Sequence, residues 1–262
     1  MEIIGFSLGI LIGISLGLIG GGGSILTIPA LVYIMHISPT NATTYSLFIV
    51  GVSALIGSIK GVKNKLLDYQ IALYFGIPSI ASIFIMRKYV MPTIPNTLFS
   101  IFNFLITKDF VIMFVFAILM IVASFSMIKK DPTQFGSIEK INITEIALKG
   151  IVVGILTGFV GVGGGFLIIP TLLFSAKIPM KKAVNTSLLI IAFNSLIGFT
   201  GSLNSNSLNW GFLIEFTSFA VVGILTGIHF SQKVSNEKLK PIFGWFVLIM
   251  GIYIMVKEIF IT

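Results

Sequence analysis

Long apolar runs separated by short polar segments fill almost the whole chain. The apolar runs lie at residues 3–19, 24–35, 44–59, 69–86, 109–128, 145–161, 165–176, 184–200, 211–229 and 241–256. Most of them contain 16 to 20 residues, close to the roughly 20 that a helix needs to cross a bilayer. Because lipid offers the backbone no hydrogen-bond partners, the pattern predicts transmembrane helices.

Two of these runs, 24–35 and 165–176, are too short for a comfortable crossing. As helices, their twelve residues each would reach only about 18 Å. Each run adjoins a glycine cluster, "GGGG" at 20–23 in the first case and "GVGGG" at 161–165 in the second. Glycine inside a helix is about 1 kcal/mol less favourable than alanine. We therefore expect each cluster to turn the chain within the membrane and to form a hairpin with a short second helix.

The composition supports a membrane protein and narrows its chemistry. The 262 residues are 56% hydrophobic and 10% charged, whereas soluble domains carry about 25% charged residues. The net charge of +8 does not indicate nucleic-acid binding, because the basic residues flank apolar runs. The chain has no cysteine, and its two histidines form no cluster that suggests a metal site. We expect a multi-pass protein of a cell membrane that is no enzyme and has no cofactor.

The chain also repeats itself. When the sequence is shifted by 141 positions, residues 17–62 align without a gap on residues 158–203, and sixteen of 46 positions are identical. Apolar composition alone would give about a tenth. This self-similarity predicts two transmembrane repeats, 1–135 and 136–262, joined at the polar linker 129–142.

Charge predicts how the repeats are oriented. If each glycine cluster turns the chain back, each repeat has a broken hairpin followed by three transmembrane helices, so the two repeats have inverted topology. Thirteen Lys and Arg then lie on the side of the linker and four on the other side. Positive charge concentrates on the cytoplasmic side of membrane proteins. The predicted fold is thus an all-α integral membrane protein of two inverted repeats.

Inverted repeats with discontinuous helices are a common plan of transporters, whose substrate site lies near the midplane between the repeats. The N-terminal ends of the two short helices would point toward the protein centre, where their free N–H groups favour an anion. The helices that follow carry neutral hydrogen-bonding side chains at aligned positions. The candidate substrate-binding residues are Gly21, Gly22, Gly23, Ser24, Thr44, Ser46, Gly163, Gly164, Gly165, Asn185, Ser187 and Asn194.

Each candidate also has a purely structural interpretation. Glycines in membrane helices often serve helix packing, serine and threonine hydroxyls bond to their own helix, and asparagine links helices. These alternatives stay open at the level of sequence.

The paired motifs "GLIGGGGSILTIPAL" and "GFVGVGGGFLIIPTL" resemble those of the sulfite exporter TauE/SafE family of membrane permeases. The resemblance extends to the final "KLKPIFGWFVLIMGIYIM". It implies a permease for small sulfur-containing anions such as sulfite and sulfonates, and leaves the substrate and the direction of transport open.

The resulting hypothesis is a secondary transporter for a small anion, sulfite or an organosulfonate, that works by alternating access. An anion channel and a transporter of another small metabolite are alternatives, and the duplicated broken helices argue against a non-transporting scaffold. The expected partners are the anionic substrate and membrane lipid, with no nucleic acid. The coupling ion is unidentified, and an oligomer is possible.

Overall fold

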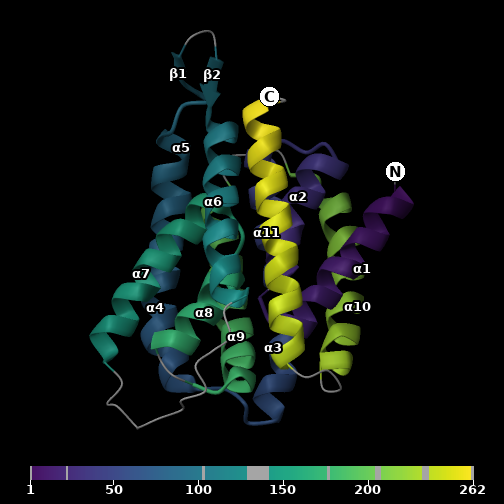
Figure 1. Ribbon diagram of the computed structural model, residues 1–262, viewed down its shortest axis with the longest axis vertical. Coiled ribbons are helices and arrows are strands. Elements are labelled where there is room, and N and C mark those ends of the chain that lie inside the picture. The colour runs from purple at the N-terminus through teal and green to yellow at the C-terminus, as the bar shows by residue number, and fades with distance from the viewer. Residues whose placement is uncertain are drawn as a thin grey trace.

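A bundle of helices makes up nearly all of the described structure (Figure 1). The computed structural model describes residues 2–21, 23–101, 104–128, 142–175, 178–203, 208–231 and 236–260. The elements of the first half are α1 (Glu2–Ile19), α2 (Gly23–Pro29), η1 (Ala30–Ile34), α3 (Pro39–Lys63), α4 (Tyr69–Ile85), η2 (Met86–Val90), α5 (Met91–Thr93), β1 (Thr97–Ile101), β2 (Phe104–Thr107) and α6 (Lys108–Ile128). Those of the second half are α7 (Ile143–Val160), α8 (Gly165–Ser175), α9 (Met180–Ser202), α10 (Trp210–Ser231) and α11 (Asn236–Phe260).

Six described helical segments are long and apolar enough to cross a membrane. They are Pro39–Lys63, Tyr69–Thr93, Lys108–Phe125, Ile143–Val160, Lys181–Ser202 and Trp210–Ser231. Large apolar side chains are exposed on the outside of the bundle, among them Ile77 of α4 at 60% and Ile249 of α11 at 63%. An apolar surface of this kind suits lipid rather than water. The prediction of an all-α membrane protein is confirmed, and the antiparallel β1–β2 hairpin is a small local departure from it.

Both glycine clusters end a helix, as the sequence predicts. Gly20 and Gly161 have φ of 79° and 78°, in the left-handed region that glycine enters at little cost and that commonly ends helices. Their backbone N–H groups donate to the carbonyl oxygens of Leu16 and Thr157, each at 2.8 Å. The chain then turns into the short helices α2 and α8.

The packing of the helices is reciprocal between the halves. Helix α1 packs along α10 and α7 along α4, while α3 packs on α9, α6 on α11 and α2 on α8. The 141-residue shift that relates the repeats carries α1 onto α7 and α4 onto α10. The α1–α10 contact and the α7–α4 contact are therefore equivalent. A methyl group built on Gly17 would come 2.9 Å from the carbonyl carbon of Gly227, and one on Gly158 would come 2.9 Å from Cβ of Met86. Gly158 and Gly227 follow Gly17 and Met86 by that same shift.

The two hairpins enter the bundle from opposite ends in Figure 1. Helix α1 runs down from the upper end, which also carries the end of α11, and α7 rises from the lower end. We call these the upper and lower ends below. The predicted repeat boundary at residues 135 and 136 lies outside the described residues. The boundary and the orientation of the halves relative to a membrane stay predictions.

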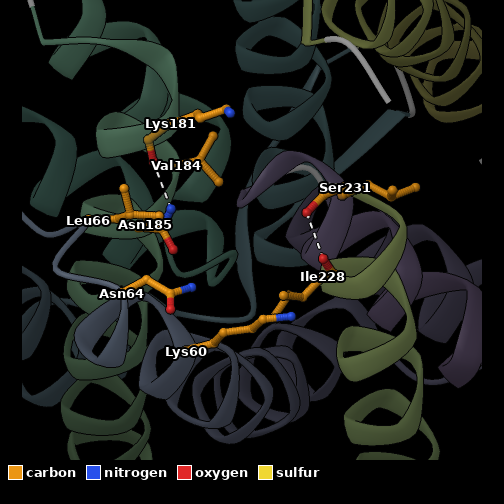
Figure 2. A pocket seen from close by; sticks show the side chains of 9 residues that line it. Lys60, Asn64, Leu66, Lys181, Val184, Asn185, Ile228 and Ser231 are labelled. Atoms are coloured by element: carbon orange, nitrogen blue, oxygen red, sulfur yellow. Dashed lines mark hydrogen bonds between the residues drawn. The ribbon is translucent and has the colours of Figure 1, made fainter. Parts of the chain in front are cut away.

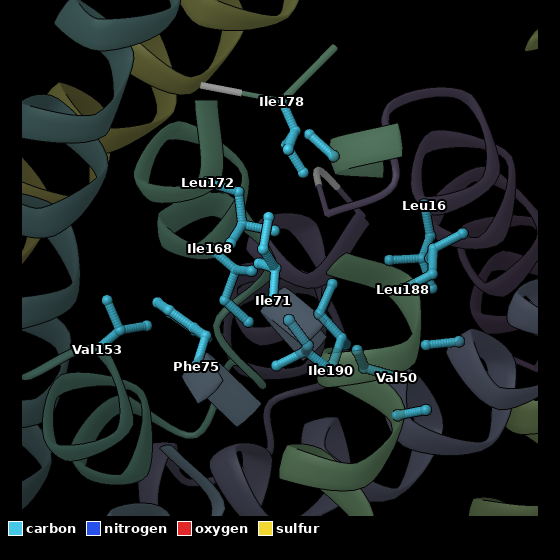
Figure 3. Packing of buried hydrophobic residues seen from close by; sticks show 14 of the residues in the cluster. Leu16, Val50, Ile71, Phe75, Val153, Ile168, Leu172, Ile178, Leu188 and Ile190 are labelled. Carbon is cyan, nitrogen blue, oxygen red and sulfur yellow. The ribbon is translucent and has the colours of Figure 1, made fainter. Parts of the chain in front are cut away.

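The core joins the two halves into one body. Figure 3 shows a buried cluster to which the first half contributes Leu16, Val50, Ile71 and Phe75, and the second half contributes Val153, Ile168, Leu172, Ile178, Leu188 and Ile190. Burial of one such side chain stabilises a fold by about 1.5–3 kcal/mol. Neither half therefore has a separate core, and the glycine turns are held at fixed positions between them.

Candidate functional site

A cavity of about 300 Å³ opens at the lower end of the bundle, between helices of both halves. We call it the vestibule. Its lining residues are Leu18, Lys60, Asn64, Leu66, Lys181, Val184, Asn185, Ile228 and Ser231 (Figure 2). They come from α1, α3 and the segment after it, and from α9 and α10. Among the candidates from the sequence, Asn185 is the one that lines this space.

The lining of the vestibule combines basic and polar residues with four apolar ones. It includes Lys60 and Lys181 and contains no Asp or Glu. Figure 2 shows the Lys60 side chain extending toward Ile228. The amide nitrogen of Asn185 donates to the carbonyl oxygen of Lys181 at 2.7 Å, and this bond fixes the orientation of the amide. A site that offers cations and neutral hydrogen-bond donors, and that has no carboxylate, favours the binding of an anion.

The vestibule lies next to the first glycine turn. A methyl group built on Gly20 would come 2.5 Å from Cγ1 of Val184, and Leu18 of the same hairpin lines the cavity. The cavity therefore borders the first hairpin close to its turn.

Most of the candidate glycines pack against protein. The backbones of Gly21 and Gly165 lie against each other, and Gly23 and Gly164 pack on the first helix of their own hairpins, beside Leu16 and Thr157. Gly22 lies outside the described residues. The structure thus brings the two turns together, and a role of these glycines in substrate binding stays a prediction.

Three of the candidate hydroxyls bond to nearby backbone. Ser24 donates to the carbonyl oxygen of Gly21 at 2.7 Å, Ser187 to that of Val184 at 2.8 Å, and Thr44 to that of Thr40 at 3.3 Å. These bonds satisfy the hydroxyl protons locally, which is the structural alternative that the sequence leaves open for them.

A second group of polar atoms is buried where α3 packs on α9. Asn194 is fully buried, and its amide nitrogen donates to Oγ of Ser79 at 2.7 Å. Within the described structure, its Oδ1 has no partner, and neither do the hydroxyls of Ser46, Ser53 and Ser195. Buried polar groups without partners are rare in proteins and require an explanation. They make this interface a second candidate for contact with a substrate.

Gly163 also belongs to this interface. A methyl group built on Gly163 would overlap the Ser195 hydroxyl, so the second glycine turn leaves that hydroxyl room. Sequence reasoning missed Ser195, although it directly follows Asn194 and could have been included on that ground.

Sequence reasoning also missed Arg87 by treating it as a charge that flanks a helix. Its side chain is only 3% exposed, in η2 at the upper end of the bundle. Arg87 is the only arginine in the chain. Its uniqueness was the one feature of the sequence that could have marked it as a candidate.

Comparisons with known proteins agree with this architecture. The family described as "Sulfite exporter TauE/SafE" matches residues 5–254. A "Probable membrane transporter protein" of Xylella fastidiosa is 29% identical over 252 residues, which cover 94% of this chain and 91% of the relative. Others in Methanocaldococcus jannaschii and Bacillus subtilis (YunE) are each 26% identical and cover 94% and 97% of this chain, and 92% and 97% of their own lengths. No solved structure is significantly similar to the chain.

The family match extends over nearly the whole chain, including both glycine turns and the helices that form the vestibule. The apolar helices and the relatives together make this a multi-pass protein of the cell membrane. The chain belongs to the sulfite exporter TauE/SafE family, and the relatives named above are probable membrane transporter proteins.

Proposed function

We propose that this transporter is a secondary carrier for a small anion, with sulfite and organosulfonates as the first candidates. It has no catalytic activity and works by alternating access at a site between two inverted repeats. The observation that supports an anion best is the lining of the vestibule, where Lys60 and Lys181 occur without a carboxylate.

The size of the electrostatic effect supports this choice. At a separation of about 4 Å and an effective dielectric constant of about 20, one lysine attracts a monovalent anion by about 4 kcal/mol. Two lysines around a cavity of about 300 Å³ would concentrate anions and repel cations. The volume is at the small end of ligand pockets, which span roughly 300–1,000 Å³, and this favours a small substrate.

An anion channel is the alternative with the same fold. The contact between the backbones of Gly21 and Gly165 favours a carrier, because the two turns meet instead of leaving a gap between them. Counterflow separates the two mechanisms. A carrier accumulates labelled anion when unlabelled anion leaves the vesicle, whereas a channel does not.

Flux into proteoliposomes tests the substrate class. The panel is sulfite, alkanesulfonates, sulfate, carboxylates and a neutral amino acid, and we expect saturable flux of sulfite or a sulfonate. Replacing both vestibule lysines, Lys60→Gln with Lys181→Gln, should raise the half-saturating concentration on the order of tenfold or more. Lys63→Gln is the matched control, because Lys63 is an exposed lysine near the end of the same helix and does not line the vestibule.

Other results would point elsewhere. Saturable flux of a neutral metabolite, unchanged in the double lysine variant, would favour a transporter of a different class. Absence of flux for every compound, in protein that is correctly folded, would favour a non-transporting scaffold.

A further inference from the structure

The vestibule at the lower end has a counterpart at the upper end. The 141-residue shift that relates the halves carries Gly20 to Gly161 and Thr43 to Val184. The contacts follow the same rule, because Gly20 packs on Val184 and Gly161 packs on Thr43. At the lower end this contact borders the vestibule. The equivalent place at the upper end can therefore be located by residue.

Arg87 fills that place. Its equivalent at the lower end is Ile228, which lines the vestibule. A methyl group built on Gly161 would overlap the Nη2 atom of Arg87, and one built on Gly201 would come 3.1 Å from its Cβ. Gly201 is in turn the equivalent of Lys60, another lining residue. The lower end thus has an open basic cavity, and the upper end has a buried basic side chain.

The guanidinium of Arg87 is poorly paired for a buried charge. Nη1 donates to the Thr43 hydroxyl at 3.0 Å, while Nε and Nη2 have no hydrogen-bond partner among the described residues. None of the carboxylates in the described part of the chain lies within the 4.0 Å of an ion pair with it. The C-terminal end of α7, at Gly161, gives the cation partial compensation through the helix dipole. The dipole does not supply an acceptor for the N–H groups of Nε and Nη2.

We infer that Arg87 is an anion-binding residue of the transport path, reached by the substrate when the upper end opens. The inference rests on the proposed function, since it assigns a residue to the site of a carrier for small oxyanions. The free Nε and Nη2 form the planar fork that binds two oxygens of one oxyanion. In the conformation seen here the lower vestibule is open and Arg87 is buried. In the opposite conformation the upper end would open and expose Arg87 to the substrate.

Exchange of radiolabelled sulfite across proteoliposomes tests this inference, with thermal unfolding of each purified variant measured in the absence of sulfite. Arg87→Gln should lower exchange on the order of tenfold or more without lowering the unfolding midpoint, because it removes a buried charge that lacks a carboxylate partner. Arg87→Lys should retain exchange at a raised half-saturating concentration, because a lysine keeps the charge and loses the fork.

Lys88→Gln is the matched control. It removes the same charge from the adjacent residue, which is exposed and lies over the rings of Phe84 and Tyr89, and it should leave exchange unchanged.

Two results would overturn the role of Arg87 and leave the proposed function intact. One is exchange by Arg87→Gln at the rate and half-saturating concentration of the parent. The other is an equal loss of exchange in both Arg87 variants together with a lower unfolding midpoint, which would make the residue a structural cap of α7. If the parent exchanges no anion of the panel, the proposed function itself fails, and this inference fails with it.

Discussion

Gly21 of the first turn and Gly165 of the second lie backbone to backbone between the two halves. A methyl group built on Gly165 would come 2.5 Å from Cα of Gly21 and 2.8 Å from its carbonyl oxygen. Glycine is the one residue that permits such an approach. The two hairpins therefore meet through their turns, and Gly21 and Gly165 pack against each other here, while their role in substrate binding stays a prediction.

Gly165→Ala should destabilise the protein. Rotating the nearby Ile191 side chain cannot make room for the added methyl group, because its nearest neighbours are backbone atoms of Gly21. Overpacking of this kind costs about 1–3 kcal/mol or more. We expect a lower thermal unfolding midpoint in detergent and a loss of flux. Gly76→Ala is the control, since its methyl group would meet only the Ile190 side chain at 3.8 Å. Equal midpoints for the parent and Gly165→Ala would show that the turns separate easily.

Asn194 tests the buried polar group of α9, which bonds to Ser79 of α4. Asn194→Ala removes the bond to Ser79 and the unpaired Oδ1, and it should weaken substrate affinity by about 1–3 kcal/mol if the substrate bonds to this amide. Asn194→Asp should be worse, because a carboxylate repels an anion strongly in a medium of low dielectric. The measurement is the half-saturating concentration for flux.

The outcome for Asn194→Asp decides between the interpretations of this residue. Transport equal to that of the parent would remove Asn194 from the site. Better transport would argue against an anionic substrate altogether. Ser79→Ala is the control, because it breaks the same hydrogen bond between α4 and α9 and leaves the amide itself in place.

The inverted orientation can be tested by labelling, because the chain contains no cysteine. Single cysteines at the exposed upper positions Ser38 and Thr93 should react with an impermeant maleimide on intact cells. Those at the exposed lower positions Lys63 and Lys182 should react only after permeabilisation. The reason is that the predicted topology assigns thirteen Lys and Arg to the side of the linker and four to the other side, and the side with the excess is predicted to be cytoplasmic. Labelling of Lys63→Cys from outside would reject this orientation.

The helices and the broken hairpins could be predicted because their cause is local. Apolar runs that lie in lipid must be helical, and glycine clusters end helices at positions such as Gly20 and Gly161. The internal repeat then predicted which elements correspond. None of these steps requires knowledge of which surfaces touch.

The site was harder to predict because its residues are defined by contacts between distant segments. Arg87 follows an apolar run and precedes Lys88, as a flanking charge would, and only the packing of α7 and α9 around it buries it. Ser195 faces Gly163, whereas Ser187 bonds to its own helix. The repeat shift could have paired Arg87 with Ile228, but the significance of that pair depends on the vestibule.

The close contacts of α1 with α10 and of α7 with α4 have a mechanical consequence. Each contact is lined by glycines, such as Gly17 on α1 and Gly158 on α7, that bring the helices too near for any added methyl group. Each contact also ties a helix of one half to a helix of the other, so the halves are linked crosswise. Pulling them apart as two blocks would break both contacts at once. Under the proposed alternating access, the bodies that move would therefore each combine helices from both halves, and the hinges would lie within the repeats.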